Sequence, residues 1–187
     1  MSYYSIALYF HIVGTLGFFV ALGLEWAGLR QIRNATTSEQ VRAGMRISNG
    51  TRRLGMASML TILMFGFYMV VVAALGEPAW IIVTLWVMVV MVVLSAALTG
   101  PRMAALGRAL ASEKGPLSSN LQQLASDPLL WVSIQTRVAI ALGIVFLMTI
   151  KPGSGGSLLT IAVAAVLGLT AGPPKKHSQR VQEGPAD

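Results

Sequence analysis

The sequence predicts an all-α fold: a polytopic transmembrane helix bundle with four long spans and a short fifth. Four apolar runs, residues 4–29, 54–75, 79–99 and 129–150, each meet the roughly 20 residues needed to cross a hydrocarbon core about 30 Å thick. Hydrophobic residues make up 55% of the chain and charged residues 11%. The cations gather between alternate pairs of runs. We therefore predict that residues 1–172 form one transmembrane domain, with lipid as its solvent.

The first run, residues 4–29, is expected to remain as a span. It has no basic region before it and no small-residue cleavage site after it, so it differs from a signal peptide. The second and third runs, residues 54–75 and 79–99, are separated by Gly76-Glu77-Pro78, which predicts a tight turn and hence two adjacent spans. In the loop after the third run, Met103, Leu106 and Leu110 continue the helical spacing.

The fourth run, residues 129–150, is opened by Asp127-Pro128, a helix N-cap followed by proline at the first helical position. The fifth, residues 157–171, would extend only about 22 Å as a helix at 1.5 Å per residue. A thinned bilayer accommodates such a span; the alternative is a re-entrant or interfacial segment. Residues 173–187 are polar and rich in Lys, Gln, Gly and Pro, which predicts a disordered tail.

The cations predict an orientation in the membrane. With five spans, twelve of the 14 Lys and Arg residues fall on one side, Lys151 falls on the other, and Arg137 lies inside a span. The positive-inside rule then places the N-terminus outside and the C-terminus in the cytoplasm of a plasma-membrane protein. The net charge of +7 is thereby explained by topology rather than by a nucleic-acid partner. Arg42, Arg46 and Arg53 share one helical face, which predicts contact with anionic lipid headgroups.

Small residues predict how the helices pack. Close backbone approach through small side chains is the main device for helix association in lipid. Such residues follow one stripe of the first run and recur in the second and fourth runs, so we expect these three spans to form the core. The small residues are Gly14, Gly17, Ala21 and Gly28 in the first run, Gly55, Ser58 and Gly66 in the second, and Ala139 and Gly143 in the fourth.

Three ionisable residues, His11, Glu25 and Arg137, lie within the runs. Charged groups facing lipid cost several kcal/mol, so these residues should face the bundle interior. His11 and Glu25 are about 40° apart around the first helix, and Glu25 lies about 21 Å deeper. Arg137 lies about two turns into the fourth run, which is expected to begin on the cytoplasmic side, so Arg137 should lie at a depth similar to that of Glu25. We predict an ion pair between Glu25 and Arg137, or a network shared with Arg52 or Arg53, in a structural or a transport role.

His11 and the methionines are the candidate ligands. An intramembrane imidazole can hold haem iron or copper, relay protons, or donate a hydrogen bond to a neighbouring helix. Haem held by two histidines would require a homodimer, because one chain supplies one such histidine. Met56 with Met59, and Met88 with Met91, each place two thioethers one turn apart. Soft sulfur suits Cu(I), although methionine is also an ordinary filler of apolar cores.

No cysteine is present, which excludes disulfides, thiolate metal sites and thiol catalysis. No nucleotide-binding loop or nucleophile–base constellation is evident, so the sequence favours a protein that is not an enzyme.

The segment YFHIVGTL at residues 9–16, a first-span histidine followed by small residues, resembles the start of the bacterial copper-resistance D-like membrane proteins and related uncharacterised small families. The segment LMTIKP at residues 147–152, before a short last span, is similar to the ends of such proteins. The resemblance implies copper or haem handling with His11 as a ligand. The family opening usually carries a tryptophan–glycine pair after the histidine, where this chain has Gly17-Phe18-Phe19.

Three hypotheses follow. The first is a bundle that binds haem or copper through His11. The second is a small transporter or accessory membrane subunit without a cofactor. The third is a haem-pathway oxidoreductase, because the small membrane protein that oxidises protoporphyrinogen also begins with a first-span histidine.

Overall fold

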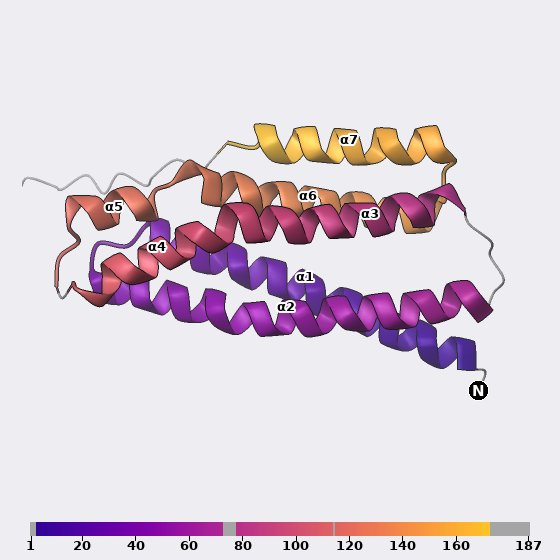
Figure 1. Ribbon diagram of the computed structural model, residues 1–187, viewed down its shortest axis with the longest axis horizontal. Coiled ribbons are helices and arrows are strands. Elements are labelled where there is room, and N and C mark those ends of the chain that lie inside the picture. The colour runs from indigo at the N-terminus through magenta and orange to yellow at the C-terminus, as the bar shows by residue number, and fades with distance from the viewer. Residues whose placement is uncertain (1–2, 73–77, 114, 173–187) are drawn as a thin grey trace, which may run out of the picture.

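The computed structural model describes residues 3–72, 78–113 and 115–172, and in these ranges the chain is helical throughout, without a β-strand (Figure 1). The predicted disordered tail and most of the predicted turn before Pro78 lie outside the described residues. The elements in chain order are α1 (Tyr3–Arg33), α2 (Ser38–Val72), α3 (Ala79–Leu94), the π-helical turn η1 (Ser95–Thr99), α4 (Gly100–Ala111), α5 (Ser119–Ala125), α6 (Pro128–Ile150) and α7 (Ser154–Thr170).

The all-α bundle is confirmed, and four stretches of helix are long and apolar enough to cross a membrane, as expected of a multi-pass membrane protein. They are Tyr3–Arg33, Ser38–Val72, Ala79–Ala111 and Ser119–Ile150. Two of them run well beyond the predicted spans, because helices from the predicted loops join them without a break: α2 begins at Ser38, and α3 continues through η1 into α4. The shorter apolar helix α7 corresponds to the predicted fifth run.

The helix ends follow their local sequence. Asp127 caps α6, its carboxylate accepting the Leu129 N–H at 2.8 Å, and Pro128 takes the first helical position as predicted. Ser118 caps α5 through the Leu121 N–H. Lys151 ends α6 in the left-handed conformation with φ 52°, and its N–H bonds the Leu147 carbonyl. These three caps set the turn before α5, the turn between α5 and α6, and the turn between α6 and α7.

Helices α1 and α2 form the most extensively contacting pair in the bundle, and small residues line their contact as predicted. A Cβ on Gly17 would lie 2.5 Å from the Ser58 hydroxyl, and one on Gly28 would lie 3.0 Å from the Gly44 carbonyl oxygen. Ala21 meets Gly55 in the same stripe. The two backbones therefore approach to a distance that larger side chains would prevent.

Helices α6 and α7 form the second close pair, and here the sequence-based prediction was wrong. Gly143 was expected to pack against the first two spans, but a Cβ there would lie 3.1 Å from the Ala164 methyl group of α7. Gly168 of α7 lies even closer to α6, since a Cβ there would be 2.4 Å from Thr136 Cα. The small residues of α6 thus bind α7, which runs antiparallel beside it (Figure 1).

The helices fall into two groups, α1 with α2 and α3 with α6 and α7 (Figure 1). The groups meet through α1 with α6 and α5, and through α2 with α4. Spans two and three, predicted to be adjacent, do not pack closely: α2 and α3 lie in different groups and are not among the helix pairs in close contact, although residues of both line one small cavity.

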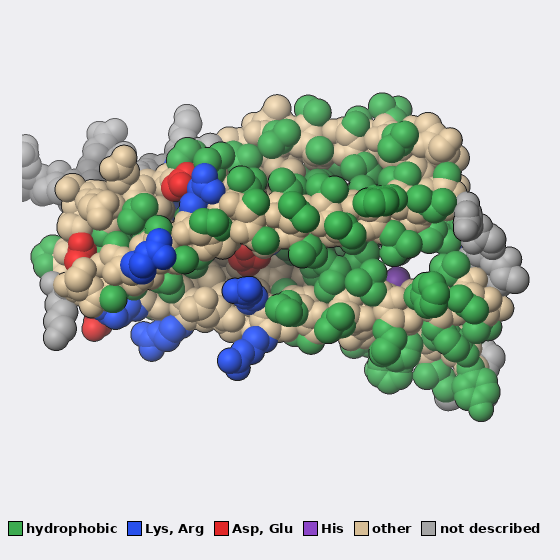
Figure 2. Space-filling view, viewed as in Figure 1, with side chains coloured by type: hydrophobic (Ala, Val, Ile, Leu, Met, Phe, Trp, Pro, Cys, Tyr) green, Lys and Arg blue, Asp and Glu red, His purple; other side chains and the backbone are tan. Residues whose placement is uncertain are grey.

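The end of the bundle that holds α4 and α5 is well packed and carries most of the charge (Figures 1 and 2). Its fully buried side chains include Ile32, Val41, Leu106 and Leu121. Arg42 donates to the carbonyl oxygens of Leu110 at 2.8 Å and Glu113 at 3.0 Å, at the end of α4. It therefore has a protein partner in addition to its predicted role at lipid headgroups, whereas Arg46 and Arg53 are exposed.

Candidate functional site

The predicted ion pair between Glu25 and Arg137 is present and joins the two helix groups. Arg137 Nη2 lies 2.5 Å from Glu25 Oε1, and Nη1 lies 2.9 Å from Oε2, so the contact is bidentate. The Arg137 side chain is 6% exposed and that of Glu25 is 17% exposed. Planar, two-pronged pairing of this kind fixes both the distance and the orientation of the helices that carry it.

A π-helical turn in the third span completes this network. Arg137 Nη1 also donates to the Ser95 hydroxyl at 3.4 Å, and Thr99 Oγ1 lies 3.0 Å from the hydroxyl of Ser133. Ser95 and Thr99 are the first and last residues of η1, where the Gly100 N–H bonds the Ser95 carbonyl five residues back. Pro101 follows directly, and a proline ring displaces the carbonyl four residues before it, which explains the widened turn.

The predicted participation of Arg52 or Arg53 in this network is not seen: both side chains are exposed, and the described partners of Arg137 come from α1, η1 and its own helix.

Two tryptophans lie near the ion pair in the sequence: Trp26 follows Glu25, and Trp131 precedes Arg137 by less than two helical turns. The Trp26 and Trp131 rings lie 5.5 Å apart, and the Arg30 guanidinium lies 5.3 Å from the Trp26 ring centroid. Aromatic rings with one polar edge are typical of a membrane–water interface.

His11 lies about 21 Å from Glu25 along α1 and faces α2. Its Nδ1 is 3.0 Å from the Ile62 carbonyl oxygen, and Gly66 leaves room for the ring, since a Cβ there would be 3.1 Å from His11 Cε1. A carbonyl oxygen can only accept, so Nδ1 carries a proton, and in the neutral imidazole Nε2 then carries the lone pair. Figure 2 shows a hollow between α2 and α3.

A small cavity lies between the two helix groups, in the region of α1 between Glu25 and His11. Its volume is about 40 Å³ and its lining is almost entirely apolar. All four spanning helices contribute to it: Thr15, Phe18 and Phe19 from α1, Met59 and Ile62 from α2, Met88 and Met91 from α3, and Ala141, Ile144, Val145 and Met148 from α6.

Three of the four methionines predicted as metal ligands therefore meet at one cavity, and the fourth does not. Met56 is 60% exposed and does not line the cavity, because its side chain lies on the outer face of α2. Met148 of α6, which the sequence analysis did not single out, takes part instead. In the described residues, no three His, Cys, Asp or Glu side chains gather as a metal cluster would require.

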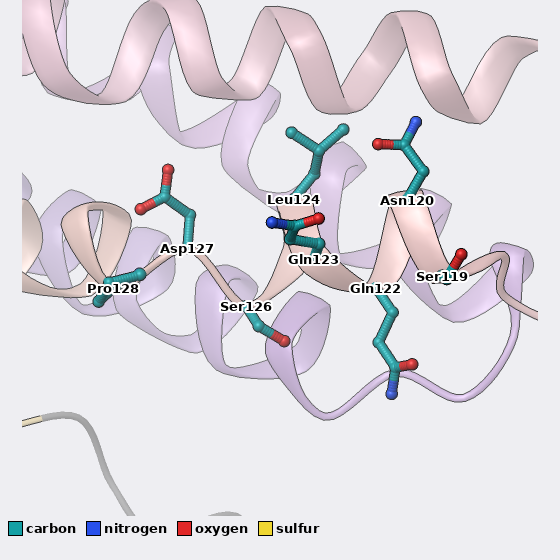
Figure 3. Close-up of a pocket in the computed structure, with 8 residues that line it drawn as sticks. All are labelled: Ser119, Asn120, Gln122, Gln123, Leu124, Ser126, Asp127 and Pro128. Carbon is teal, nitrogen blue, oxygen red and sulfur yellow. The ribbon is translucent and has the colours of Figure 1, made fainter.

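A second, larger concavity lies on the surface beside α5 (Figure 3). Its lining is mostly amide and hydroxyl side chains: Ser119, Asn120, Gln122, Gln123, Leu124, Ser126, Asp127 and Pro128. These side chains point in different directions from a short helix and the turn that follows it, as Figure 3 shows. Asp127, its one charged member, already pairs with Arg102 at 2.9 Å. This surface has no convergent set of groups for binding or catalysis.

Sequence reasoning missed the polar residues of η1 and Ser133, although a signal existed. Gly100-Pro101 after a long apolar run marks a local departure from α-helical geometry, and hydroxyl residues beside such a departure are candidates for a polar network. Met148 carried no comparable signal, because it has no methionine one turn away. Comparisons with models of protein families, with curated proteins and with solved structures found no match to this chain, so the resemblance to copper-resistance D-like proteins stays a prediction.

Proposed function

We propose that this chain is a multi-pass protein of the plasma membrane that binds copper within its helix bundle, with His11 as a ligand. The observation that carries the proposal is the state of the His11 ring. Because Nδ1 donates to the Ile62 carbonyl, Nε2 of the neutral imidazole is unprotonated and able to bind a metal. Histidine ligands in metal sites almost always donate their other ring nitrogen to a carbonyl or carboxylate in this way.

The size of the cavity between the helix groups favours a single ion over a porphyrin as its occupant. Pockets for drug-sized molecules measure roughly 300–1,000 Å³, whereas the cavity between the groups measures about 40 Å³. The lining of this cavity offers thioether sulfur, and His11 lies one helical turn from it along α1; thioether and imidazole are both donors that suit copper. The same comparison counts against haem in this cavity.

The orientation with the N-terminus outside and the C-terminus in the cytoplasm belongs to this proposal. Figure 2 supports it, since the Lys and Arg side chains on this face gather toward the end with α4 and α5, and the other end is apolar. Helix α7, the predicted fifth run, is proposed to span the membrane as well. It runs antiparallel to α6 from Ser157, whose hydroxyl bonds the Pro152 carbonyl, to Gly168 beside Thr136.

A small transporter without a bound cofactor is the second candidate, favoured by the division into two helix groups. The groups are joined by the Glu25–Arg137 pair toward one end and enclose the cavity between that pair and His11. Bundles that rock against each other around a central site are a general design of transporters. In this case the cavity would be a transient position of the substrate.

The test is an absorption spectrum and a metal analysis of the detergent-purified protein, before and after Cu(I) is supplied. We expect about one copper per chain, lost in His11→Ala and retained in the matched control His177→Ala, which removes the other histidine of the chain. Both variants should elute as the folded wild type does. A folded, copper-free wild type after Cu(I) is supplied would contradict the proposal, as would equal copper in wild type and His11→Ala.

A further inference from the structure

We infer that the cavity between the two helix groups is a thioether site for a soft monovalent ion, Cu(I) or Ag(I), with Met59, Met88, Met91 and Met148 as its ligands. The inference deepens the proposed function, on which it rests, by naming the kind of ion and the residues that select it. It differs from the sequence-based expectation in two ways. Met56 is not part of the site, and Met148 is.

The geometry gathers these four side chains from three helices. Met59 belongs to α2, Met88 and Met91 to consecutive turns of α3, and Met148 to α6. Met88 and Met91 are 7% and 3% exposed. Helices α2 and α3 belong to different groups, so four methionines meet only across the cavity between them.

The volume fits one ion. A cavity needs roughly 10–15 Å³ of accessible volume to hold one water molecule. The cavity measures about 40 Å³, with a lining that offers polar atoms almost nowhere. Water is a poor occupant of such a space, since it needs two to four polar partners. A soft ion that binds sulfur has no such requirement.

The chemistry of the lining selects the ion. Thioether sulfur is a soft, neutral donor that favours Cu(I), whereas divalent Mg²⁺ and Ca²⁺ prefer oxygen ligands. Phe18 and Phe19 also line the cavity, and the face of an aromatic ring attracts a cation. Neutral ligands cannot compensate two charges in an apolar interior, so a monovalent ion is favoured over a divalent one.

His11 has a separate part in this arrangement. It is one helical turn from Thr15, which lines the cavity, so it lies about 6 Å further along α1. Its free Nε2 can take the ion before the methionines do, or complete their coordination. The thioether site and the His11 site are thus neighbouring but separable, and variants can remove either one.

The experiment measures Ag(I) binding, with Ag(I) as a redox-inert probe, to the full-length protein in detergent by metal analysis and titration. Methionine is replaced by leucine, a change that nearly conserves volume, in Met59→Leu, Met88→Leu and the double variant. The matched control is Met56→Leu, which lies on the same helix as Met59 but outside the cavity. Thermal unfolding of each variant verifies that it is folded.

We expect about one Ag(I) per wild-type chain. The single cavity variants should weaken binding at least about 10- to 100-fold, the range typical for loss of an outer-shell partner, because each removes a ligand itself. Met56→Leu should bind as the wild type does, and Zn²⁺ should not compete. Unchanged binding in the folded Met59→Leu, Met88→Leu double variant overturns the thioether site, and so does equal weakening by Met56→Leu.

The two proposals fail in different ways. If the double variant still binds copper and His11→Ala does not, the thioether site is wrong and the His11 proposal stands. If neither Ag(I) nor Cu(I) binds the folded wild type, both are wrong, and the four methionines are packing side chains. If the double variant loses Ag(I) and His11→Ala keeps it, the thioether site stands without His11.

Discussion

The interface between the two helix groups has two unlike regions. Around Arg137, α1, η1 and α6 are joined by a bidentate ion pair and by hydroxyl groups of Ser95, Thr99 and Ser133. One turn further along α6, from Ala141 to Met148, the lining is apolar and encloses a cavity. Polar contacts therefore close one region, and the neighbouring region remains incompletely packed.

The difference shows that one region of the interface fixes the position of the helices and the other leaves space for a ligand. In lipid, apolar side chains give helices little preference for each other over lipid, whereas a buried ion pair has one matching partner. The polar region can thus hold the two groups in register. The apolar region is then free to keep a space that close packing would otherwise fill.

The largest expected effect comes from breaking the polar region with Glu25→Ala. Removing one partner of a buried ion pair leaves an uncompensated charge and costs about 3–5 kcal/mol. Arg137, with a side chain 6% exposed, would be left buried without its charged partner. We expect a large fall in the free energy of unfolding, measured by denaturant titration in detergent.

Two variants accompany this measurement. Glu39→Ala removes an exposed acidic residue outside the network and should have little effect. The charge exchange Glu25→Arg with Arg137→Glu should recover part of the stability lost in either single variant. A double variant no better folded than the single ones would show that the pair does not join the groups as described.

A smaller effect is expected from Thr99→Val in the same region. The change removes the 3.0 Å hydrogen bond between Thr99 and Ser133 and keeps the shape of the side chain. Hydrogen bonds between membrane helices contribute about 1 kcal/mol or less, so the loss should be of that size. The same denaturant titration measures it.

Thr149→Val is the matched control for this change. Thr149 is exposed and bonds the Val145 carbonyl within its own helix, so its replacement should not affect contact between helices. A loss at Thr149 equal to that at Thr99 would contradict a role for η1 in joining α3 to α6.

The smallest effect, opposite in sign, is expected from Ala141→Val, which extends a side chain into the cavity. Unfilled volume costs about 24 cal/mol per Å³, so filling most of the 40 Å³ should stabilise the protein by at most about 1 kcal/mol. Ag(I) binding should fall at the same time, because the ion and the added methyl groups need the same space.

Ala162→Val, on an exposed face of α7, is the control for both readouts. It should change neither stability nor Ag(I) binding. A marked destabilisation by Ala141→Val would mean that the region beside Ala141 is already filled, and the contrast between the two regions would then be lost.

Much of the architecture could be predicted from the sequence. Length and hydropathy predicted the four long helices, because each must satisfy its backbone hydrogen bonds within itself to cross lipid. Spacing along one helix predicted the shared face of Gly14, Gly17 and Ala21, since periodicity is a local property. The cost of an unpaired charge in lipid predicted that Glu25 and Arg137 would find each other.

Which helices are neighbours was decided only by the tertiary structure. The tight turn suggested that α2 and α3 would lie together, and Gly143 was expected to face the first two spans; instead α2 pairs with α1, and Gly143 packs on Ala164 of α7. Likewise, Met148 lines the cavity and Met56 does not, because the cavity forms where residues of four helices meet. A single sequence fixes the face of a helix through its period, but the partner of that face depends on how all the helices fit together, and apolar surfaces in lipid accept many partners.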